Sequence, residues 1–159
     1  MSRITPCLLF GGNAEEAVNF YVSLFPEARI DHVSRYGEGA HVPAGTALMI
    51  EFSLFGQRYQ ALNGPDVAFN EAVSFSFRCA DQAEVDHYWA ALTADGGKGG
   101  PCSWLTDKFG LSWQIVPQAM IDILSRPDKA ATARAMAAMM QMSKLDIAKL
   151  EAAYAGEAA

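Results

Sequence analysis

Basic residues are few in this chain of 159 residues: 12 lysines and arginines stand against 18 aspartates and glutamates, which gives a formal net charge of −6. Proteins that bind nucleic acid use a basic stripe to release counterions, so this balance argues against nucleic acid as a partner. Long apolar runs are also lacking, because none reaches the roughly 18 residues that cross a bilayer. We therefore expect neither nucleic acid nor a membrane among the partners.

Cysteine is scarce as well. Cys7, Cys79 and Cys102 are too few and too scattered for a disulfide framework or a closed zinc site. The first residues lack an apolar segment followed by a cleavage site, so nothing in them indicates export. These observations favour a reduced, cytoplasmic protein. With 51% hydrophobic residues, the chain has enough apolar mass for one ordinary domain, or for two small units that share a core.

A five-residue pattern of glycine, two residues, an aromatic and glutamine occurs twice, at 56–60 and at 110–114. Upstream of each copy lies a helical pattern with an aromatic pair, Phe20-Tyr21 and Tyr88-Trp89. Each of these helices follows an apolar strand pattern. The order of strand, helix, further strands and glycine turn therefore occurs twice, which indicates an internal duplication. It places Gln60 and Gln114 at equivalent positions.

The expected elements follow from periodicity and from capping and turn residues. In the first half we expect strands at 4–10, 30–36, 47–54 and 58–62, and in the second half at 73–79, 103–105 and 111–116. One helix per half is expected, capped by Asn13 with Glu16 and by Asp81 with Glu84. The inward positions of the two halves are expected to include Phe20, Tyr21, Trp89, Leu92 and Ile115.

The predicted class is α+β, with two paired β-α-β-β-β units followed by C-terminal helices. The duplicated core is expected to span 1–117, with units of about 1–64 and 65–117, and a helical extension to span 118–159. The extension carries methionines and other apolar residues that two short helices cannot hide alone. These residues are Met136, Met139, Met140, Leu145, Ile147, Leu150 and Tyr154.

A set of short motifs is spread over nearly the whole chain, at residues 10–17, 20–21, 24–26, 56–57, 61–64, 71–75, 104–117 and 144–147, of which the stretch from Trp104 to Pro117 is the most specific. In these motifs the chain resembles the PhnB-like branch of the vicinal oxygen chelate superfamily, whose domains are often labelled 3-demethylubiquinone-9 3-methyltransferase. The superfamily includes glyoxalase I, extradiol dioxygenases, and bleomycin and fosfomycin resistance proteins.

The resemblance also supplies an expectation about metal. Superfamily members with a catalytic metal take one ligand from the first strand of each unit and one from the last. Counting from the glycine turns and the aromatic pairs, these positions fall on Pro6, Gln60, Ser74 and Gln114. A shift of one or two residues in the first strands meets Thr5, Cys7, Phe75 or Ser76, and never a histidine. Divalent ions favour imidazoles and carboxylates, so we expect neither a bound metal nor another cofactor.

Five polar or aromatic side chains remain as cavity candidates if the strands of the duplicated units close around a hollow. They are Gln60, Asn63, Ser74, Trp104 and Gln114. Amides, a hydroxyl and an aromatic wall suit a neutral or weakly polar small molecule. The alternative is a filled core in which these groups satisfy one another and a few waters. His41, in a Gly/Pro loop, either closes over a ligand or is an exposed loop residue.

Three functions are therefore open. The first is a metal-free protein that binds a small molecule, with no assigned reaction. The second is a metal-dependent enzyme of the glyoxalase or dioxygenase type whose ligands lie elsewhere, and the third is a scaffold without chemistry of its own. The methyltransferase label has no support in the residues, because the turn at 10–13 lacks the full glycine fingerprint of a nucleotide site. Both the apolar extension and the resemblance predict a two-fold homodimer.

Overall fold

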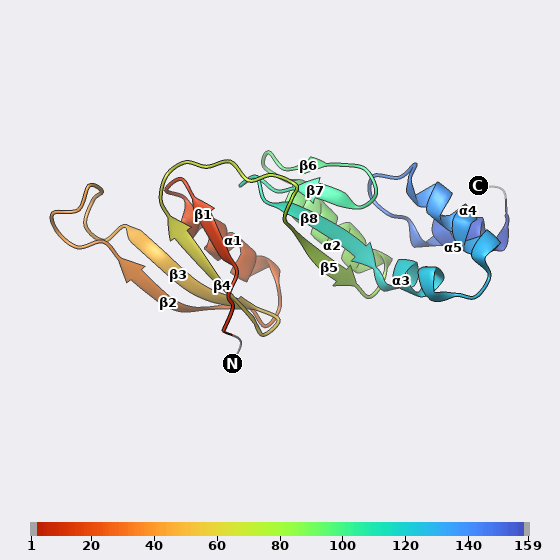
Figure 1. The fold of residues 1–159 in the computed structure, drawn as a ribbon, viewed down its shortest axis with the longest axis horizontal. Coiled ribbons are helices and arrows are strands. Elements are labelled where there is room, and N and C mark those ends of the chain that lie inside the picture. Colours follow the sequence, from red (N-terminus) through yellow and green to blue (C-terminus); the bar gives the residue numbers. More distant parts are fainter. Residues whose placement is uncertain (1–2, 158–159) are drawn as a thin grey trace. The chain divides into compact units, whose positions relative to one another are not determined.

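The computed structural model describes residues 3–157, and the chain divides into two compact units between Ala68 and Phe69. Unit 1 precedes this point and unit 2 follows it (Figure 1). Among the described residues, no helix has the length and apolar character needed to cross a bilayer.

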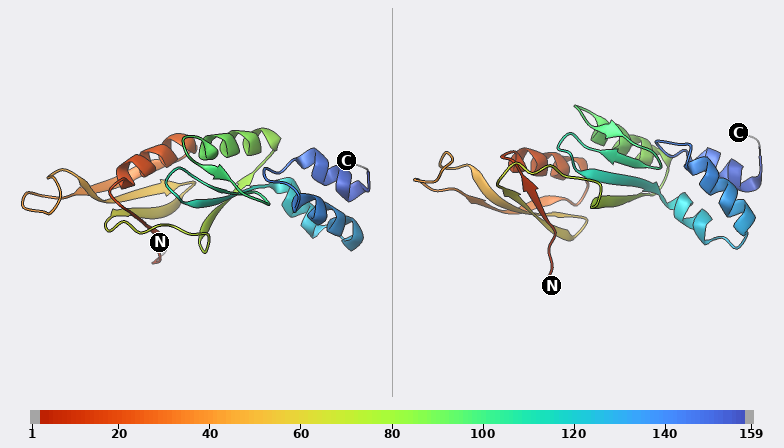
Figure 2. Two further views of the ribbon diagram at one scale, coloured as in Figure 1. Left: turned by 90° about the horizontal axis from the view of Figure 1, so that it is seen from above. Right: turned by 45° about the horizontal axis from the view of Figure 1, so that its top comes forward.

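Unit 1 is a four-stranded sheet with one helix. Its elements are β1 (Cys7–Phe10), α1 (Ala14–Leu24), β2 (Arg29–Arg35), β3 (Ala47–Leu54) and β4 (Gln57–Asn63). The strand order is β1-β4-β3-β2, with β1 parallel to β4 and the other neighbours antiparallel. The helix covers one face of this sheet (Figure 2). Tyr21 and Val18 of α1 and Ile50 and Phe52 of β3 are fully buried between helix and sheet.

Unit 2 repeats this arrangement. Its elements are β5 (Ser74–Cys79), α2 (Gln82–Thr93), β6 (Lys98–Gly99), β7 (Trp104–Thr106) and β8 (Ser112–Pro117). The strand order is β5-β8-β7-β6, and β5 is again parallel to β8. The four strands of each sheet follow the same order, which confirms the predicted duplication and the α+β class. The two turn glycines are equivalent too, since Gly56 and Gly110 both have left-handed backbones, with φ of 76° and 89°.

Two expectations about the helices are corrected. Phe20 and Trp89 are only partly buried, whereas Tyr21, Leu92 and Ile115 are in the core. On α2 the inward positions are Val85, Tyr88 and Leu92, which share one face at helical spacing. Trp89 lies one step round the helix and contacts Gly99 instead, where an added Cβ would meet its ring at 2.7 Å.

The predicted caps differ in outcome. Asp81 caps α2, since its Oδ1 accepts a hydrogen bond from the backbone N–H of Glu84 at 2.9 Å. The side chain of Asn13 makes no such bond at the start of α1. The first N–H of that helix, at Ala14, is bound instead by Oδ1 of Asn63, 2.9 Å away on β4. A residue distant in the sequence therefore supplies the bond that we assigned to a local cap.

The C-terminal extension folds as α3 (Gln118–Ser125), α4 (Lys129–Met139) and α5 (Ile147–Ala155), which belong to unit 2. The three helices share a small core of their own, and the residues buried there are Met120, Ile123, Ala135, Leu145 and Leu150. Leu145 and Leu150 are therefore hidden within the bundle, contrary to the expectation that two helices leave them exposed. Met136 and Met140 remain exposed, by 41% and 64%.

Candidate functional site

The face of each sheet that the helix does not cover carries most of the predicted site residues. Alternation along β8 places Ser112 and Gln114 on this face of unit 2, and cross-strand register adds Ser74, Trp104 and Thr106. In unit 1 the same argument gives Cys7, Glu51 and Gln60. We call these surfaces the open faces of the two sheets.

On the open face of unit 2, three of the candidates, Ser74, Gln114 and Trp104, are neighbours. Nε2 of Gln114 donates a hydrogen bond to Oγ of Ser74 at 2.8 Å, and Trp104 lies beside Gln114 in the antiparallel register of β7 and β8. All three side chains are partly buried. The amide and the hydroxyl satisfy each other in part, as the filled-core alternative supposes, while the indole ring borders open space.

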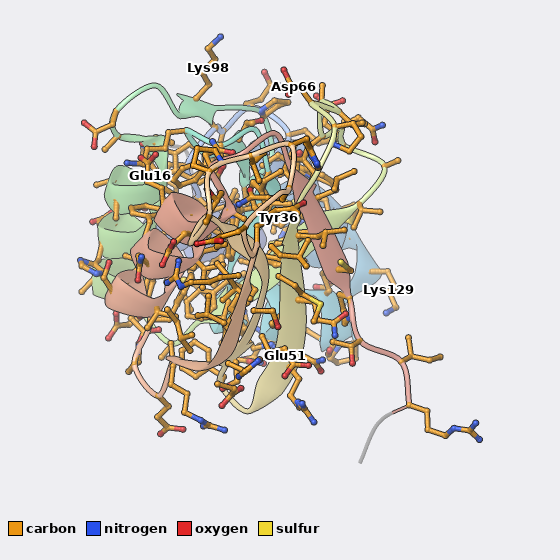
Figure 3. All side chains as sticks on the ribbon, turned by 90° about the vertical axis from the view of Figure 1, so that its left-hand side faces the viewer. Glu16, Tyr36, Glu51, Asp66, Lys98 and Lys129 are labelled. Carbon is orange, nitrogen blue, oxygen red and sulfur yellow. The ribbon has the colours of Figure 1, made fainter. Side chains whose placement is uncertain are left out.

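That open space is a cavity of about 380 Å³ within unit 2. Its lining is mainly apolar, and consists of Glu71, Lys98, Gly99, Gly100, Pro101, Trp104, Leu105, Thr106 and Ser112. The exposed Lys98 side chain extends away from the ribbon (Figure 3), and Glu71 is the other charged residue of the lining.

Ser112 is the polar group most enclosed at this cavity. The residue is only 2% exposed and lines the cavity, beside Thr106 in the register of β7 and β8. Within residues 3–157, the side-chain oxygen that is buried without a hydrogen-bond partner is Oγ of Ser53, on the sheet of unit 1. Ser112 was not among the predicted site residues. It lies two residues before Gln114 on the same strand, so alternation along β8 is the signal that locates it.

In unit 1 the two predicted residues have different surroundings. Gln60 and Asn63 are three apart on β4, so their side chains lie on opposite faces of the strand. Asn63 is 7% exposed, and its amide is engaged at both ends, by Ala14 N–H and by the carbonyl of Ala47 at 2.8 Å. The prediction that the five candidates share one inward direction therefore does not hold for Asn63.

Gln60 lies in a row that crosses the whole sheet of unit 1. The register places Cys7 of β1 on one side of Gln60, and Glu51 of β3 on the other, followed by His32 of β2. Nε2 of Gln60 donates a long hydrogen bond to Oε1 of Glu51 at 3.4 Å. Glu51 was missed because the count used only first and last strands. The signal that could have found it is the hairpin turn at Phe55-Gly56, because counting outward from this turn along both strands pairs Glu51 with Gln60.

Among the described residues, these side chains do not form a metal centre at the first and last strands of the two units. Pro6 offers only its carbonyl, which accepts a hydrogen bond from the backbone N–H of Gln60 at 2.9 Å. The residue beside Gln60 on the open face is Cys7, and burial raises the pKa of its thiol, which disfavours the thiolate that metals bind. Within residues 3–157, no three His, Cys, Asp or Glu side chains gather closely enough to hold an ion. The donor set therefore does not fit a divalent metal.

A second cavity, of about 540 Å³, lies in unit 1 at the start of α1. It is lined by Gly11, Gly12, Tyr36, His41, Val42, Thr46, Asn63, Gly64 and Pro65. The rings of Tyr36 and His41 meet edge to face with centroids 5.6 Å apart. His41 is exposed and also borders this cavity, so both descriptions given for it from the sequence apply.

Comparison with known proteins gives consistent matches. A family model described as 3-demethylubiquinone-9 3-methyltransferase matches residues 2–116. The PhnB protein from Bacillus cereus is 35% identical, with a TM-score of 0.66, and the match covers 73% of this chain and 99% of that one. No curated protein matches the chain.

Two more distant structures share the fold. A Pseudomonas aeruginosa protein is 21% identical with a TM-score of 0.59, over 74% of this chain and 98% of its own. The fosfomycin resistance protein FosX from Mesorhizobium loti is 14% identical with a TM-score of 0.58, over 79% of this chain and 98% of its own. At these identities the likeness shows the fold alone.

Proposed function

The chain belongs to the family described as 3-demethylubiquinone-9 3-methyltransferase, within the PhnB-like branch of the vicinal oxygen chelate superfamily, and we propose from this premise that it binds a small, neutral, flat molecule in the cavity of unit 2. The face of Trp104 takes the ring of the ligand. The hydroxyls of Ser112 and Thr106 bind a carbonyl or amine group on it.

The observation that carries this proposal is the hydroxyl of Ser112. Ser112 is 2% exposed and borders a cavity large enough for a small molecule, which Trp104 and Thr106 also line. A ligand in this cavity can therefore hydrogen-bond a hydroxyl and stack on an aromatic ring at the same time. The carboxylate of Glu71 offsets the ammonium of Lys98 in the lining of this cavity, and the Lys98 side chain extends away from the ribbon (Figure 3), which favours a neutral ligand over an anion.

Binding in this proposal needs no divalent metal. The structure of FosX from Listeria monocytogenes contains Mn(II) and sulfate, but that protein is only 14% identical to this chain. Here the corresponding strands offer Gln60 and Gln114, whose amides lack the charge of a carboxylate.

Methyl transfer is not part of the proposal either. A doubly wound nucleotide fold would continue from Gly11-Gly12 into repeated β-α units with neighbouring parallel strands. Instead β1 has a single parallel neighbour, β4, which is the last strand of unit 1 in the sequence. The other strand pairs of this sheet are antiparallel. The family description therefore supports membership, and the residues of this chain support ligand binding.

The experiment is a thermal-shift screen of neutral aromatic amides, ketones and amines, followed by three variants. A ligand that binds only the folded state raises the melting temperature. We expect Trp104→Ala and Ser112→Ala to abolish or weaken that rise. Tyr36→Ala, which alters the cavity of unit 1, is the matched control and should leave the rise intact. Equal loss in the control assigns binding to unit 1, and no shift with any compound favours the scaffold alternative.

Assembly and location complete the proposal. The protein functions as a symmetric homodimer in the cytoplasm, with no role for nucleic acid given its charge of −6. Exposed methionines at 136 and 140 of α4 support an interface on the extension, although the bundle already covers Leu145 and Leu150. All three cysteines are free, as suits a reducing compartment.

A further inference from the structure

The connector between α4 and α5, residues 140–146, runs along the strands that form the cavity of unit 2. Two backbone hydrogen bonds join it to the turn that precedes β7. The N–H of Cys102 donates to the carbonyl of Met142 at 2.8 Å, and the N–H of Ser103 donates to the carbonyl of Ser143 at 2.9 Å. The hydroxyl of Ser143 also donates to the carbonyl of Gly100 at 2.5 Å. Gly100 is part of the cavity wall.

The turn held in this way has an unfavourable backbone. Cys102 and Ser103 both have left-handed conformations, with φ of 55° and 70°. Residues other than glycine rarely adopt this backbone conformation, and they do so where the surrounding structure holds them in it. Both of these residues donate their N–H groups to the connector. The carbonyl groups of the connector therefore accept hydrogen bonds from the two residues of the turn whose backbone conformation is unfavourable.

A second set of contacts fastens the connector to α2. Nε2 of Gln82 donates to the carbonyl of Leu145 at 3.1 Å, while Oε1 of Gln82 accepts from the N–H of Ile147 at 2.8 Å. Lys144 pairs with Asp86 on the next turn of α2. One glutamine side chain thus binds both the end of the connector and the first residue of α5. The connector is fixed between α2 and the turn at 100–103.

Close packing continues from these contacts into the cavity wall. An added Cβ at Gly99 would lie 2.7 Å from the ring of Trp89 and 3.3 Å from Oγ of Ser143. Gly99 thus lies next to Trp89 of α2 and Ser143 of the connector, although it is exposed to solvent. Gly99, Gly100, Pro101 and Trp104 all line the cavity, so a movement of the connector changes its wall directly.

We propose that the α4–α5 connector is a positioning element for the cavity of unit 2, so that the C-terminal extension determines whether the binding wall is formed. The matching family model ends at residue 116, before α3 begins, so the connector lies outside the matched range. The expected effect of the connector on ligand binding rests on the proposed function. The other part of the proposal, the mechanical part, is that the connector supports residues 98–106, and it rests only on the contacts described above.

Hydrogen exchange of the full chain tests the mechanical part without any ligand. Gln82→Ala removes the amide bonds to Leu145 and to Ile147 at the start of α5, together with a bond to Asp86 within α2, and Ser143→Ala removes one hydroxyl. Gln118→Ala is the matched control, because its amide bonds Asp122 on its own helix and does not touch the connector. We expect exchange of residues 98–106 to be about fivefold faster in the two test variants, the factor expected for one lost hydrogen bond of ordinary strength. Residues 57–63 of unit 1 should exchange as in the wild type.

Unchanged exchange at 98–106 in both test variants overturns the proposal, and so does equal acceleration in Gln118→Ala. If Gln82→Ala fails to fold, the milder Ser143→Ala decides by itself. Uniform acceleration throughout unit 2 means a general loss of stability and also counts against a positioning role.

The binding consequence is measured with N-phenyl-1-naphthylamine, a neutral fluorescent probe. We expect Ser143→Ala to bind it several-fold more weakly than wild type, and the bound probe to slow exchange in residues 142–147 of the wild type. This second effect follows because coupling between two sites is reciprocal. A wild-type protein that does not bind the probe counts against the proposed function, whereas exchange at 98–106 still decides the role of the connector.

Discussion

The carboxylate of Asp107 accepts a hydrogen bond from the indole nitrogen of Trp113, with 2.9 Å between Oδ2 and Nε1. Its other oxygen accepts from the backbone N–H groups of Phe109 and Leu111, at 2.9 and 3.0 Å. Asp107 is 2% exposed, so one buried carboxylate organises the whole glycine turn before β8. This turn sets the register that places Ser112 and Gln114 on the open face.

Replacement of Asp107 is therefore expected to be costly. In Asp107→Ala, the buried N–H of Trp113 loses its partner, and two turn amides lose theirs. We expect the free energy of unfolding to fall by about 2–4 kcal/mol, measured by urea denaturation. Asp95→Asn, at an exposed loop position, is the control and should change it little. A fall below about 1 kcal/mol in Asp107→Ala would contradict this role.

Gly99 is a position where only glycine fits. Because an added Cβ would meet the ring of Trp89 at 2.7 Å, Gly99→Ala should destabilise the protein by about 1–3 kcal/mol. Gly37→Ala is a good control, since nothing lies within 4 Å of a Cβ there. Thermal unfolding of the two variants checks this. Similar melting temperatures for both would show that Trp89 moves aside without cost.

The cysteines should differ in reactivity. Burial, with added repulsion from Glu84 and Asp81, raises the pKa of the Cys79 thiol to about 12. The thiolate is the reactive form, so native Cys79 should resist iodoacetamide at pH 8, whereas the exposed Cys7 reacts slowly. Because the folded state holds this proton more tightly than the unfolded one, stability should decrease as pH rises above the ordinary thiol pKa. Mass spectrometry of labelled protein tests the reactivity, and rapid labelling of Cys79 would refute it.

No tightly bound divalent ion is expected at Gln60, Ser74 and Gln114. Added EDTA should leave the melting temperature unchanged, because removal of a bound ion would lower it. Elemental analysis after dialysis gives the decisive result. Stoichiometric nickel, zinc or iron that disappears in Gln114→Ala would establish the metal-dependent alternative.

A chain that ends at Pro117 should lose solubility or its dimeric state. The truncation removes the connector that supports the turn at 100–103, and it uncovers Val116, which packs against the bundle core. Light scattering at tens of micromolar measures the assembly of both chains. A full-length monomer, or a truncated chain that stays dimeric and equally stable, would contradict the dimer proposal.

The sequence predicted the duplicated fold because its signals are local. Two left-handed glycines, at 56 and 110, and the alternation of the strands that follow them repeat in both halves. The capping of α2 by Asp81 was equally local, and it was predicted. The capping of α1 was not, because Asn63 reaches its helix across the sheet and no sequence spacing reports that contact.

The candidate site was predictable in part for the same reason. Gln114 and Ser74 follow from strand position, and they do meet. Ser112 was not predicted, although alternation along β8 places it on the same face as Gln114, because the sequence does not show that β6, a two-residue strand in a glycine-rich segment, completes the sheet beside this cavity. The support from Gln82 and Ser143 depends on how the extension packs, and nothing in the helical pattern of residues 118–159 specifies that packing.

The parallel pairing of β1 with β4 affects the order in which the protein can assemble during its synthesis. Cys7 leaves the ribosome early, but its register partner Gln60 follows only after a helix and two further strands. The first strand of each unit is therefore expected to dock last, onto a hairpin already formed by its successors. Until then, the edge of β4 that will receive β1 stays unpaired in the nascent chain, and it is there that we expect chaperones to bind.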